Sequence, residues 1–313
     1  MQWLAIFLFS LGISCIESET EASQLDYTQD ESFKRWCAEF CESESEEYLA
    51  RIYPTWRENA EFVEKRNRLG LPYSVSLNRF AQLSLEEFSK SHLRQWKRNS
   101  SPAEFRPVPD RGGRDPPPKS VDWRTKGVVP PVKNQGQCGG PIPFQVVHAV
   151  DSLHAIQTGT LELGSVEEYV DCCEDGPCDG GVYGVGSYDC IVKIGGLALQ
   201  SVYVSPDHKC LNDTFKSELK IEGGKSVTPY RNETALEYAV AMQPVVAAID
   251  ASHESFQLYE GGVYYEPDCS SVELDHAVLV VGYGATEDGV EYWICQNSWV
   301  IQLGNARLHP HGT

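Results

Sequence analysis

The sequence is poor in basic residues for its length. Its 313 residues include 26 Lys plus Arg against 45 Asp plus Glu, so the formal net charge is −19. A chain this acidic is a poor partner for the phosphates of nucleic acid or for anionic membrane surfaces. We therefore expect no nucleic-acid ligand. Hydrophobic residues make up 41% of the chain, which excludes wholesale disorder.

Long apolar runs are also missing. Residues 3–13 are apolar but too few to span a bilayer, no Lys or Arg precedes them, and acidic sequence follows. We interpret residues 1–18 as a signal peptide, with a buried helix as the alternative, and expect no membrane span. The predicted route is the secretory pathway, to the lysosome or the extracellular space. Three N-x-[ST] sequons are predicted glycosylation sites: Asn99, Asn212 and Asn232.

Zinc-binding spacing is absent as well. The chain has 11 cysteines, but no Cys-x2-Cys pair is matched by a second one, and no clustered histidines complete a ligand set. Cys172, Cys173 and Cys178 lie close together, with Cys138 upstream and Cys210 downstream. We therefore predict disulfides and expect neither a metal nor another cofactor.

The remaining patterns predict an α+β protein in two blocks. The first block, residues 32–93, contains a helical pattern at 46–69 that Pro54 should kink or split, and a second helix capped by Ser84 with Glu87. A linker rich in Pro and Gly, residues 94–118, offers a site for proteolysis. The second block, residues 119–313, starts with a helix near 144–156 and continues after Val245 as apolar strand-like runs.

Several motifs in the second block resemble those of papain-family cysteine proteases. They read SVDWRTKGVVPPVKNQGQCGG at residues 120–140, LDHAVLVVGYG at 274–284 and NSW at 297–299. Residues 248–271 resemble the cathepsin L branch in particular. The first block resembles the inhibitory propeptide of that family, through Trp56, Asn59, Val63, Asn67, Ser76, Asn78, Phe80 and Gln82, with Glu47 and Arg51 one residue out of register. The resemblance implies a two-lobed fold, with a helical lobe and a β-rich lobe, preceded by a helical inhibitory domain.

The resemblance also assigns roles to individual residues. It makes His276 the catalytic base, Asn297 the amide that orients it, Gln135 an oxyanion donor and Trp299 the shield over the His–Asn bond. Four further positions are expected to bind substrate: Gly139, Gly180, Gly181 and Asp275. The implied disulfides are Cys138–Cys178 and Cys172–Cys210. No partner follows for Cys37, Cys41, Cys173, Cys190, Cys269 or Cys295.

The nucleophile position departs from the family. Where the family reads Cys-Gly-Ser-Cys-Trp-Ala-Phe, residues 138–144 read Cys-Gly-Gly-Pro-Ile-Pro-Phe, so Pro141 stands in the position of the nucleophile. Proline has neither a thiol nor an N–H, and it is tolerated in the first turn of a helix. We expect the fold to survive this change and the chemistry to be lost.

The sequence after Trp299 departs too. It reads VIQLGNARLHPHGT and lacks the further strands of the family, including the cysteine that would pair with Cys269. We interpret this as a C-terminal truncation and expect Cys269 to be unpaired and part of a sheet edge to be exposed.

Three hypotheses follow. The first is an inactive, monomeric pseudoprotease that binds peptides, inhibitors or cathepsins. The second is an active lysosomal or secreted cysteine endopeptidase, if the segment Gly140–Pro143 results from a gene-model error. The third is a propeptide-type protease inhibitor that acts through residues 32–93.

Overall fold

The structure is a computed structural model that describes residues 26–43, 45–94, 116–135, 140–173, 186–229, 231–299 and 305–308, the side chains of 305–307 excepted. The predicted signal peptide, most of the predicted linker and Asn99 lie outside these residues. No helix in the described ranges is long and apolar enough to cross a membrane.

The N-terminal block (residues 26–94) is mainly helical. It contains η1 (Tyr27–Gln29), α1 (Glu31–Phe40), α2 (Glu46–Asn67), β1 (Tyr73–Val75) and α3 (Leu85–His92). Helix α1 starts at Asp30, whose carboxylate accepts the N–H groups of Ser32 and Phe33. Aromatic rings from α1 and α2 pack together, with Phe33 4.9 Å from Tyr53 and 5.2 Å from Trp56 between ring centroids. The predicted capping box at α3 is confirmed, because Ser84 and Glu87 bond each other's backbone N–H.

Helix α2 is not split at Pro54, although the sequence predicts a kink or a split there. The helix continues from Glu46 to Asn67 with Pro54 inside it. Both Pro54 and Ala50, whose carbonyl loses its helical partner, are exposed, so water can bond that carbonyl. Ile52 and Trp56 on the opposite face are buried, and this packing stabilises the helix on both sides of Pro54.

The helical lobe is built around α4. Its elements are α4 (Pro141–Thr158), α5 (Val166–Cys173), α6 (Gly186–Lys193) and the two-stranded sheet of β3 (Leu197–Ala198) and β4 (Ser217–Leu219). Helix α4 is buried on most sides and ends at Gly159, whose φ of 80° suits glycine. The helix predicted near 144–156 is thus confirmed and begins earlier.

The β-rich lobe holds the larger sheet. Its other elements are β2 (Val121–Asp122), η3 (Trp123–Lys126), α7 (Glu233–Val240), β5 (Val245–Ile249), α8 (Glu254–Gln257), β6 (Tyr259–Tyr264), β7 (His276–Ala285), β8 (Glu291–Gln296) and β9 (Asn305–Leu308). The strand order is β1-β6-β9-β8-β7-β2, and β5 pairs with β7 beside β2. The strands predicted after Val245 are found. The sequence after Trp299 contributes β9, which pairs with β8 and with β6.

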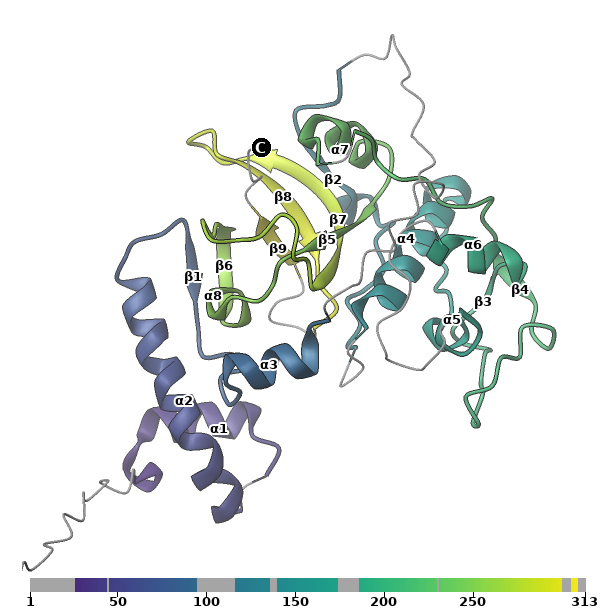
Figure 1. Ribbon diagram of the computed structural model, residues 1–313. Helices are drawn as coiled ribbons and strands as arrows, with labels where there is room; N and C mark the ends of the chain where they lie inside the picture. The colour runs from purple at the N-terminus through teal and green to yellow at the C-terminus, as the bar shows by residue number, and fades with distance from the viewer. Residues whose placement is uncertain are drawn as a thin grey trace, which may run out of the picture.

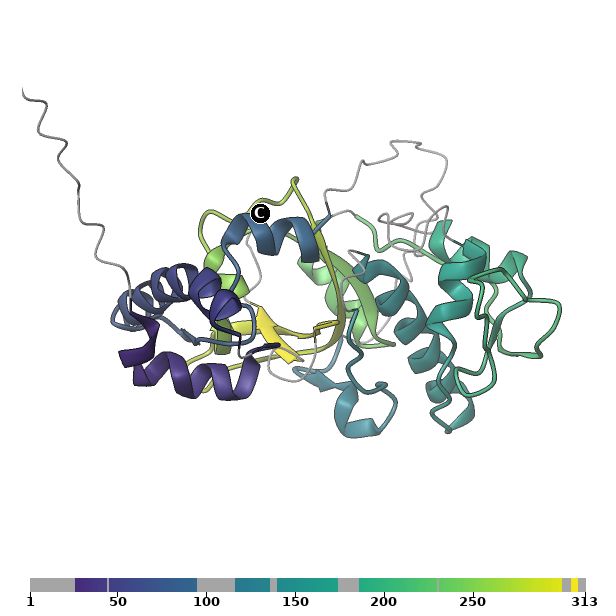
Figure 2. The same cartoon turned by 90° about the horizontal axis from the view of Figure 1, so that it is seen from below.

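The N-terminal block joins this sheet. Strand β1 pairs antiparallel with β6, with Tyr73 opposite Gly262. Figures 1 and 2 show α1 and α2 at one end of the molecule, the sheet in the middle and α4–α6 at the other end. Residues from the N-terminal block and the β-rich lobe share one buried core, in which Phe80 and Phe88 meet Phe256 and Trp299.

Three disulfides are present among the described cysteines. Cys172–Cys210 is the pair that the resemblance implies, and Cys37–Cys41 and Cys173–Cys190 had no expected partners. Cys269 and Cys295 are free. The expected pair Cys138–Cys178 lies outside the described residues.

Candidate active site

The site is centred on a buried histidine and asparagine. His276 is the first residue of β7, and Asn297 directly follows β8, the antiparallel neighbour of β7. His276 Nε2 lies 2.8 Å from Asn297 Oδ1, and both residues are buried. Because an amide oxygen only accepts, Nε2 carries the proton of this bond. The other ring nitrogen, Nδ1, is buried and has no hydrogen-bond partner among the described atoms.

Trp299 covers this pair. Its ring stacks on the ring of His276, with centroids 4.3 Å apart. Phe80, Phe88 and Phe256 surround the same indole edge to face, so water is excluded from this side. Burial lowers the pKa of His276 to about 4, although the bond to Asn297 opposes the shift. The imidazole is therefore neutral at neutral pH.

Gln135 lies on the same buried network. Its backbone N–H donates to Ser298 O at 2.9 Å, and its side-chain Oε1 accepts from the Ser298 hydroxyl. The amide Nε2 is 3.5 Å from the carbonyl oxygen of His92 in the N-terminal block. The N–H groups of a side-chain amide are donors of the kind that a carbonyl or an oxyanion accepts.

Pro141 opens helix α4. It occupies the first helical position after Gly140, where its missing N–H breaks no helical bond, and it is buried. The following residue, Ile142, packs in one core cluster with Ala277, the residue after His276. Helix α4 contacts β7, and the first turn of α4 shares its core cluster with the start of the strand that carries the histidine.

The N-terminal block reaches into this site. The N–H of Arg94 donates to the carbonyl of Asp275 at 2.9 Å, one residue before His276. Burial raises the pKa of the Asp275 carboxyl to about 6, although the N–H of Ala251 donates to it at 2.7 Å. The end of the N-terminal block is therefore bonded to two site residues, through His92 to Gln135 and through Arg94 to Asp275.

Sequence reasoning did not single out His92 or α8. His92 packs its ring on Phe88 and Trp299, and burial lowers its pKa to about 4. Gln257 at the end of α8 donates to the carbonyls of Phe80 and Leu83, which anchors the block beside the site. A histidine at the end of a capped helix gives no sequence signal of its own, because the packing partners are remote in the chain.

The structure describes only some of the other predicted positions. Gly139, Gly180 and Gly181 lie outside the described residues. Asn232 is exposed and caps α7 by accepting from the N–H of Ala235, whereas Asn212 is half-buried in a loop. The thiol of Cys295 lies in the hydrophobic core with Val278 and Val280, so it is remote from the polar site.

Comparisons with known proteins define the class. The model of the family "Papain family cysteine protease" matches residues 117–307, and that of the "Cathepsin propeptide inhibitor domain" matches residues 33–88. The chain therefore belongs to the papain family of cysteine proteases and carries a cathepsin-type propeptide inhibitor domain.

Individual relatives agree with this assignment. Cysteine proteinase 5 of Dictyostelium discoideum is 33% identical over 319 residues, covering 95% of this chain and 91% of that protein. A recombinant stem bromelain precursor superposes with a TM-score of 0.79 at 28% identity, covering 90% of this chain and 92% of that chain. The digestive procathepsin L 3 of Tenebrio molitor gives a TM-score of 0.73 at 29% identity, covering 90% and 93%. The two-lobed α+β fold with a propeptide is thereby confirmed.

Proposed function

We propose that this chain is a cathepsin L-like member of the papain family without peptidase activity, which acts by binding peptides or protein partners in its cleft. The observation that carries the proposal is Pro141 at the first position of α4, whose first turn shares a core cluster with the start of β7. The motif register gives this position to the nucleophile, and no covalent intermediate can form on proline.

The remaining groups fit binding better than catalysis. A papain-type base is charged through its pair with a thiolate, whereas His276 is buried, neutral and without a partner at Nδ1 among the described residues. Proline also removes one backbone oxyanion donor, and the loss of such a donor costs about 2.7–4 kcal/mol of transition-state stabilisation. The missing thiol and the missing oxyanion donor both act against peptide hydrolysis. We therefore assign the retained His276, Asn297 and Gln135 to the fold of the site and to contacts with a ligand.

The site already shows a mode of binding. The carbonyl of Asp275 accepts an N–H from Arg94, and Gln135 faces the carbonyl of His92. Both are contacts to main-chain groups, which any extended peptide offers. We propose that Asp275 and Gln135, with Gly139, Gly180 and Gly181, bind the main chain of peptide ligands once the N-terminal block leaves the cleft.

A second candidate function belongs to the N-terminal block. As a released fragment, it would inhibit active cathepsin L-like enzymes. The unbroken α2 and its aromatic contacts with α1 favour this candidate, because Pro54 does not disrupt the fold that such an inhibitor needs. The test is whether residues 26–94, produced alone, slow a cathepsin L-type enzyme at micromolar concentration.

The compartment is proposed on family grounds. Disulfide-bonded papain-family proteases are typical of the secretory pathway, and this structure has three disulfides among its described cysteines. We propose delivery to the lysosome or the extracellular space, with glycans at the exposed Asn232 and at Asn99 and Asn212.

The decisive experiment restores the family segment. The full chain is compared with a variant that reads Ser-Cys-Trp-Ala at residues 140–143 and with a matched variant that reads Ser-Ala-Trp-Ala. We expect hydrolysis of a fluorogenic peptide at acid pH, and labelling by a thiol-directed epoxide, from the cysteine variant alone. Hydrolysis by the unmodified chain would overturn the proposal. Sequencing the transcript across codons 134–146 settles whether Pro141 is encoded.

A further inference from the structure

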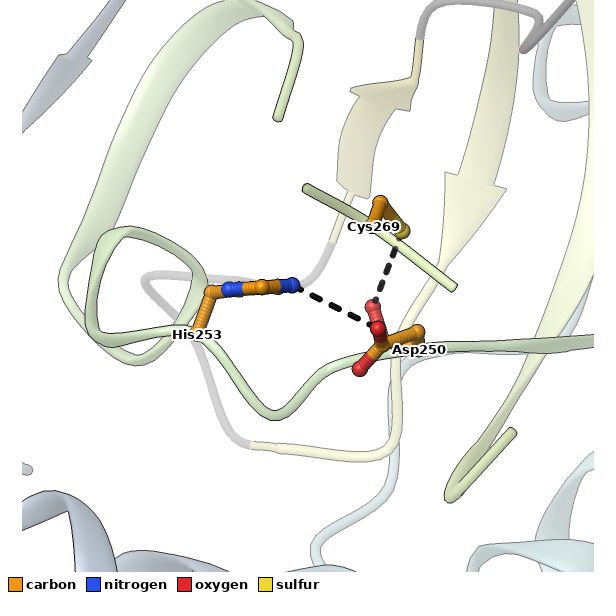
Figure 3. Close-up of side chains that lie close together, drawn as sticks. All are labelled: Asp250, His253 and Cys269. Atoms are coloured by element: carbon orange, nitrogen blue, oxygen red, sulfur yellow. Dashed lines mark hydrogen bonds and ion pairs between the residues drawn. The ribbon is translucent and has the colours of Figure 1, made fainter. Parts of the chain in front are cut away.

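A second group of reactive side chains lies behind the His276 site, in two loops of the β-rich lobe. Asp250 follows β5, His253 precedes α8, and Cys269 lies between β6 and β7. One ligand atom from each residue lies within 4.8 Å of the other two. Figure 3 shows the imidazole and the thiol directed toward Asp250 from two sides.

The distances fit a common metal ion. His253 Nε2 is 3.4 Å from Asp250 Oδ2, and Cys269 Sγ is 3.7 Å from the backbone oxygen of Asp250. Two ligand atoms about 2.1 Å from a tetrahedral zinc ion lie about 3.4 Å apart, and a sulfur and a nitrogen lie about 3.6 Å apart. The imidazole and carboxylate therefore already have the required separation, and the thiol sulfur, which lies within 4.8 Å of both ligand atoms, would move closer to complete the set.

The histidine has an unused ligand atom. His253 Nε2 is buried and makes no hydrogen bond to any described residue, because its contact with Asp250 lacks hydrogen-bond geometry. An orphaned buried nitrogen is unfavourable unless something binds it. The main chain of His253 is fixed, since its carbonyl accepts the N–H groups of Phe256 and Gln257.

The carboxylate is held in place by its surroundings. Asp250 Oδ1 accepts the N–H and the hydroxyl of Ser252, and Oδ2 accepts the N–H of Ser270 at 2.7 Å. Each carboxylate oxygen has two lone pairs, so Oδ2 can still bind a metal. Such outer bonds orient the ligands of established metal sites.

The local charge favours a cation. The carboxylates of Asp250, Asp275 and Glu266 all act on Cys269, and together with burial they raise the pKa of its thiol to about 12. Arg66 neutralises Glu266 at 2.8 Å. A divalent ion bound here would compensate the remaining negative charge and would displace the thiol proton to solvent.

We propose that Asp250, His253 and Cys269 form a zinc-binding site with one position open to water. A mixed sulfur, nitrogen and oxygen donor set suits zinc and excludes magnesium and calcium, which require oxygen ligands. The ion joins the loop after β5 to the loop before β7. Ile249 of β5 pairs with His276, so the site clamps the strand pair that carries the histidine. The proposal is independent of the proposed function.

The test uses the full chain after treatment with a chelator. Titration with Co²⁺ is expected to give a thiolate-to-cobalt charge-transfer band that saturates at one ion per chain and that Zn²⁺ removes. Cys269→Ser is expected to abolish the band, and His253→Gln to weaken Co²⁺ binding by about tenfold or more. His208→Gln is the matched control, because His208 Nδ1 also faces a carboxylate, that of Asp171 at 3.6 Å, yet belongs to a different cluster without cysteine.

Three results would overturn the site. They are the absence of the band, a band that survives in folded Cys269→Ser, and peptide mapping that finds Cys269 in a disulfide. If Cys269→Ser does not fold, His253→Gln decides. Unchanged Co²⁺ affinity in that variant rejects the site, and weaker binding with the His208→Gln control unaffected supports it.

Discussion

At the scale of single residues, His276 and Asn297 act as part of the core as well as the site. Their hydrogen bond lies under Trp299, and both side chains are buried. A buried polar group left without its partner carries its full desolvation penalty. The hydrogen bond between His276 and Asn297 therefore stabilises the folded chain, independently of any catalytic role.

We expect Asn297→Ala to lower the free energy of unfolding by roughly 1–3 kcal/mol, because His276 Nε2 loses its acceptor. Urea denaturation of the full chain measures this change. Asn212→Ala is the control, since Asn212 lies in a half-buried loop, and it should stay within about 0.5 kcal/mol of the unmodified chain. Equal effects of the two substitutions would contradict the role given to Asn297.

His92 makes the docking of the N-terminal block sensitive to pH. Burial, and then the charge of Arg79, lower its pKa from 6.5 to about 4. The undocked histidine binds a proton more readily, so the stability of the docked state is fully present above pH 6.5 and falls as the pH drops toward 4. The cation Arg79 strengthens the effect of burial on the pKa of His92, and a hydrogen bond to the backbone of Phe88 opposes it; His92 in turn lowers the pKa of His276.

We expect His92→Phe to keep the stacking on Phe88 and to reduce the loss of docking in acid. Hydrogen exchange of the backbone amides of α3, compared between pH 7 and pH 4, measures this loss of docking. His276 still titrates in the variant, so the pH dependence becomes shallower and does not vanish. A variant with the same acid-induced exchange as the unmodified chain would show that His92 is not the sensor.

At the scale of elements, the pairing of β1 with β6 depends on a single glycine. Gly262 of β6 has φ of 95°, and a Cβ there would lie 2.4 Å from the carbonyl oxygen of Pro72. The close approach of β1 to β6 therefore requires glycine at this position. The neighbouring Gly261 has open space around its Cβ position.

We expect Gly262→Ala to detach β1 and to expose the segment around Tyr73 to limited proteolysis. Gly261→Ala provides a matched control one residue away, and its cleavage pattern should equal that of the unmodified chain. Comparison of the cleavage patterns of the two variants at neutral pH measures the detachment of β1. Protection of β1 in the Gly262→Ala chain would show that the strand tolerates the added carbon.

The elements also show how far the sequence leads. The capping box at Ser84 and the apolar runs after Val245 are local signals, so α3 and strands β5–β8 could be predicted. The residue pattern alone starts α4 only near residue 144, whereas the family resemblance places Pro141 at the start of this helix, where the structure has it. Of the kink or split predicted at Pro54, the split is not found, because burial of the opposite face outweighs one lost hydrogen bond.

The candidate site divides in the same way. The family motifs give His276, Asn297, Gln135 and Trp299, which the structure brings together. The cluster of Asp250, His253 and Cys269 has no such motif. Its members lie on separate loops, and only the pairing of β5 with β7 brings those loops close.

At the scale of the whole molecule, the N-terminal block and the β-rich lobe behave as one unit. They share a buried core, a strand pairing and the ion pair between Arg66 and Glu266 at 2.8 Å. A shared core, a strand pairing and an ion pair can together hold the two parts in place without a covalent link between them.

We therefore expect a chain cut between residues 94 and 116 to remain a single species at pH 7 and to separate near pH 4. Size-exclusion chromatography of the cut chain at the two pH values measures it. The Gly262→Ala chain, cut at the same place, should separate more readily at pH 7. Separation of the unmodified cut chain at neutral pH would show that the link is required.

The first turn of α4 has a further consequence for the unfolded chain. Prolines at 141 and 143 restrict the backbone before folding begins, at positions whose helical conformation suits them. Such a restriction lowers the conformational entropy lost on folding and stabilises the native state by about 0.4–1 kcal/mol per site. Under the proposed function, position 141 does not have to present a nucleophile, so it can take a residue that stabilises the native state.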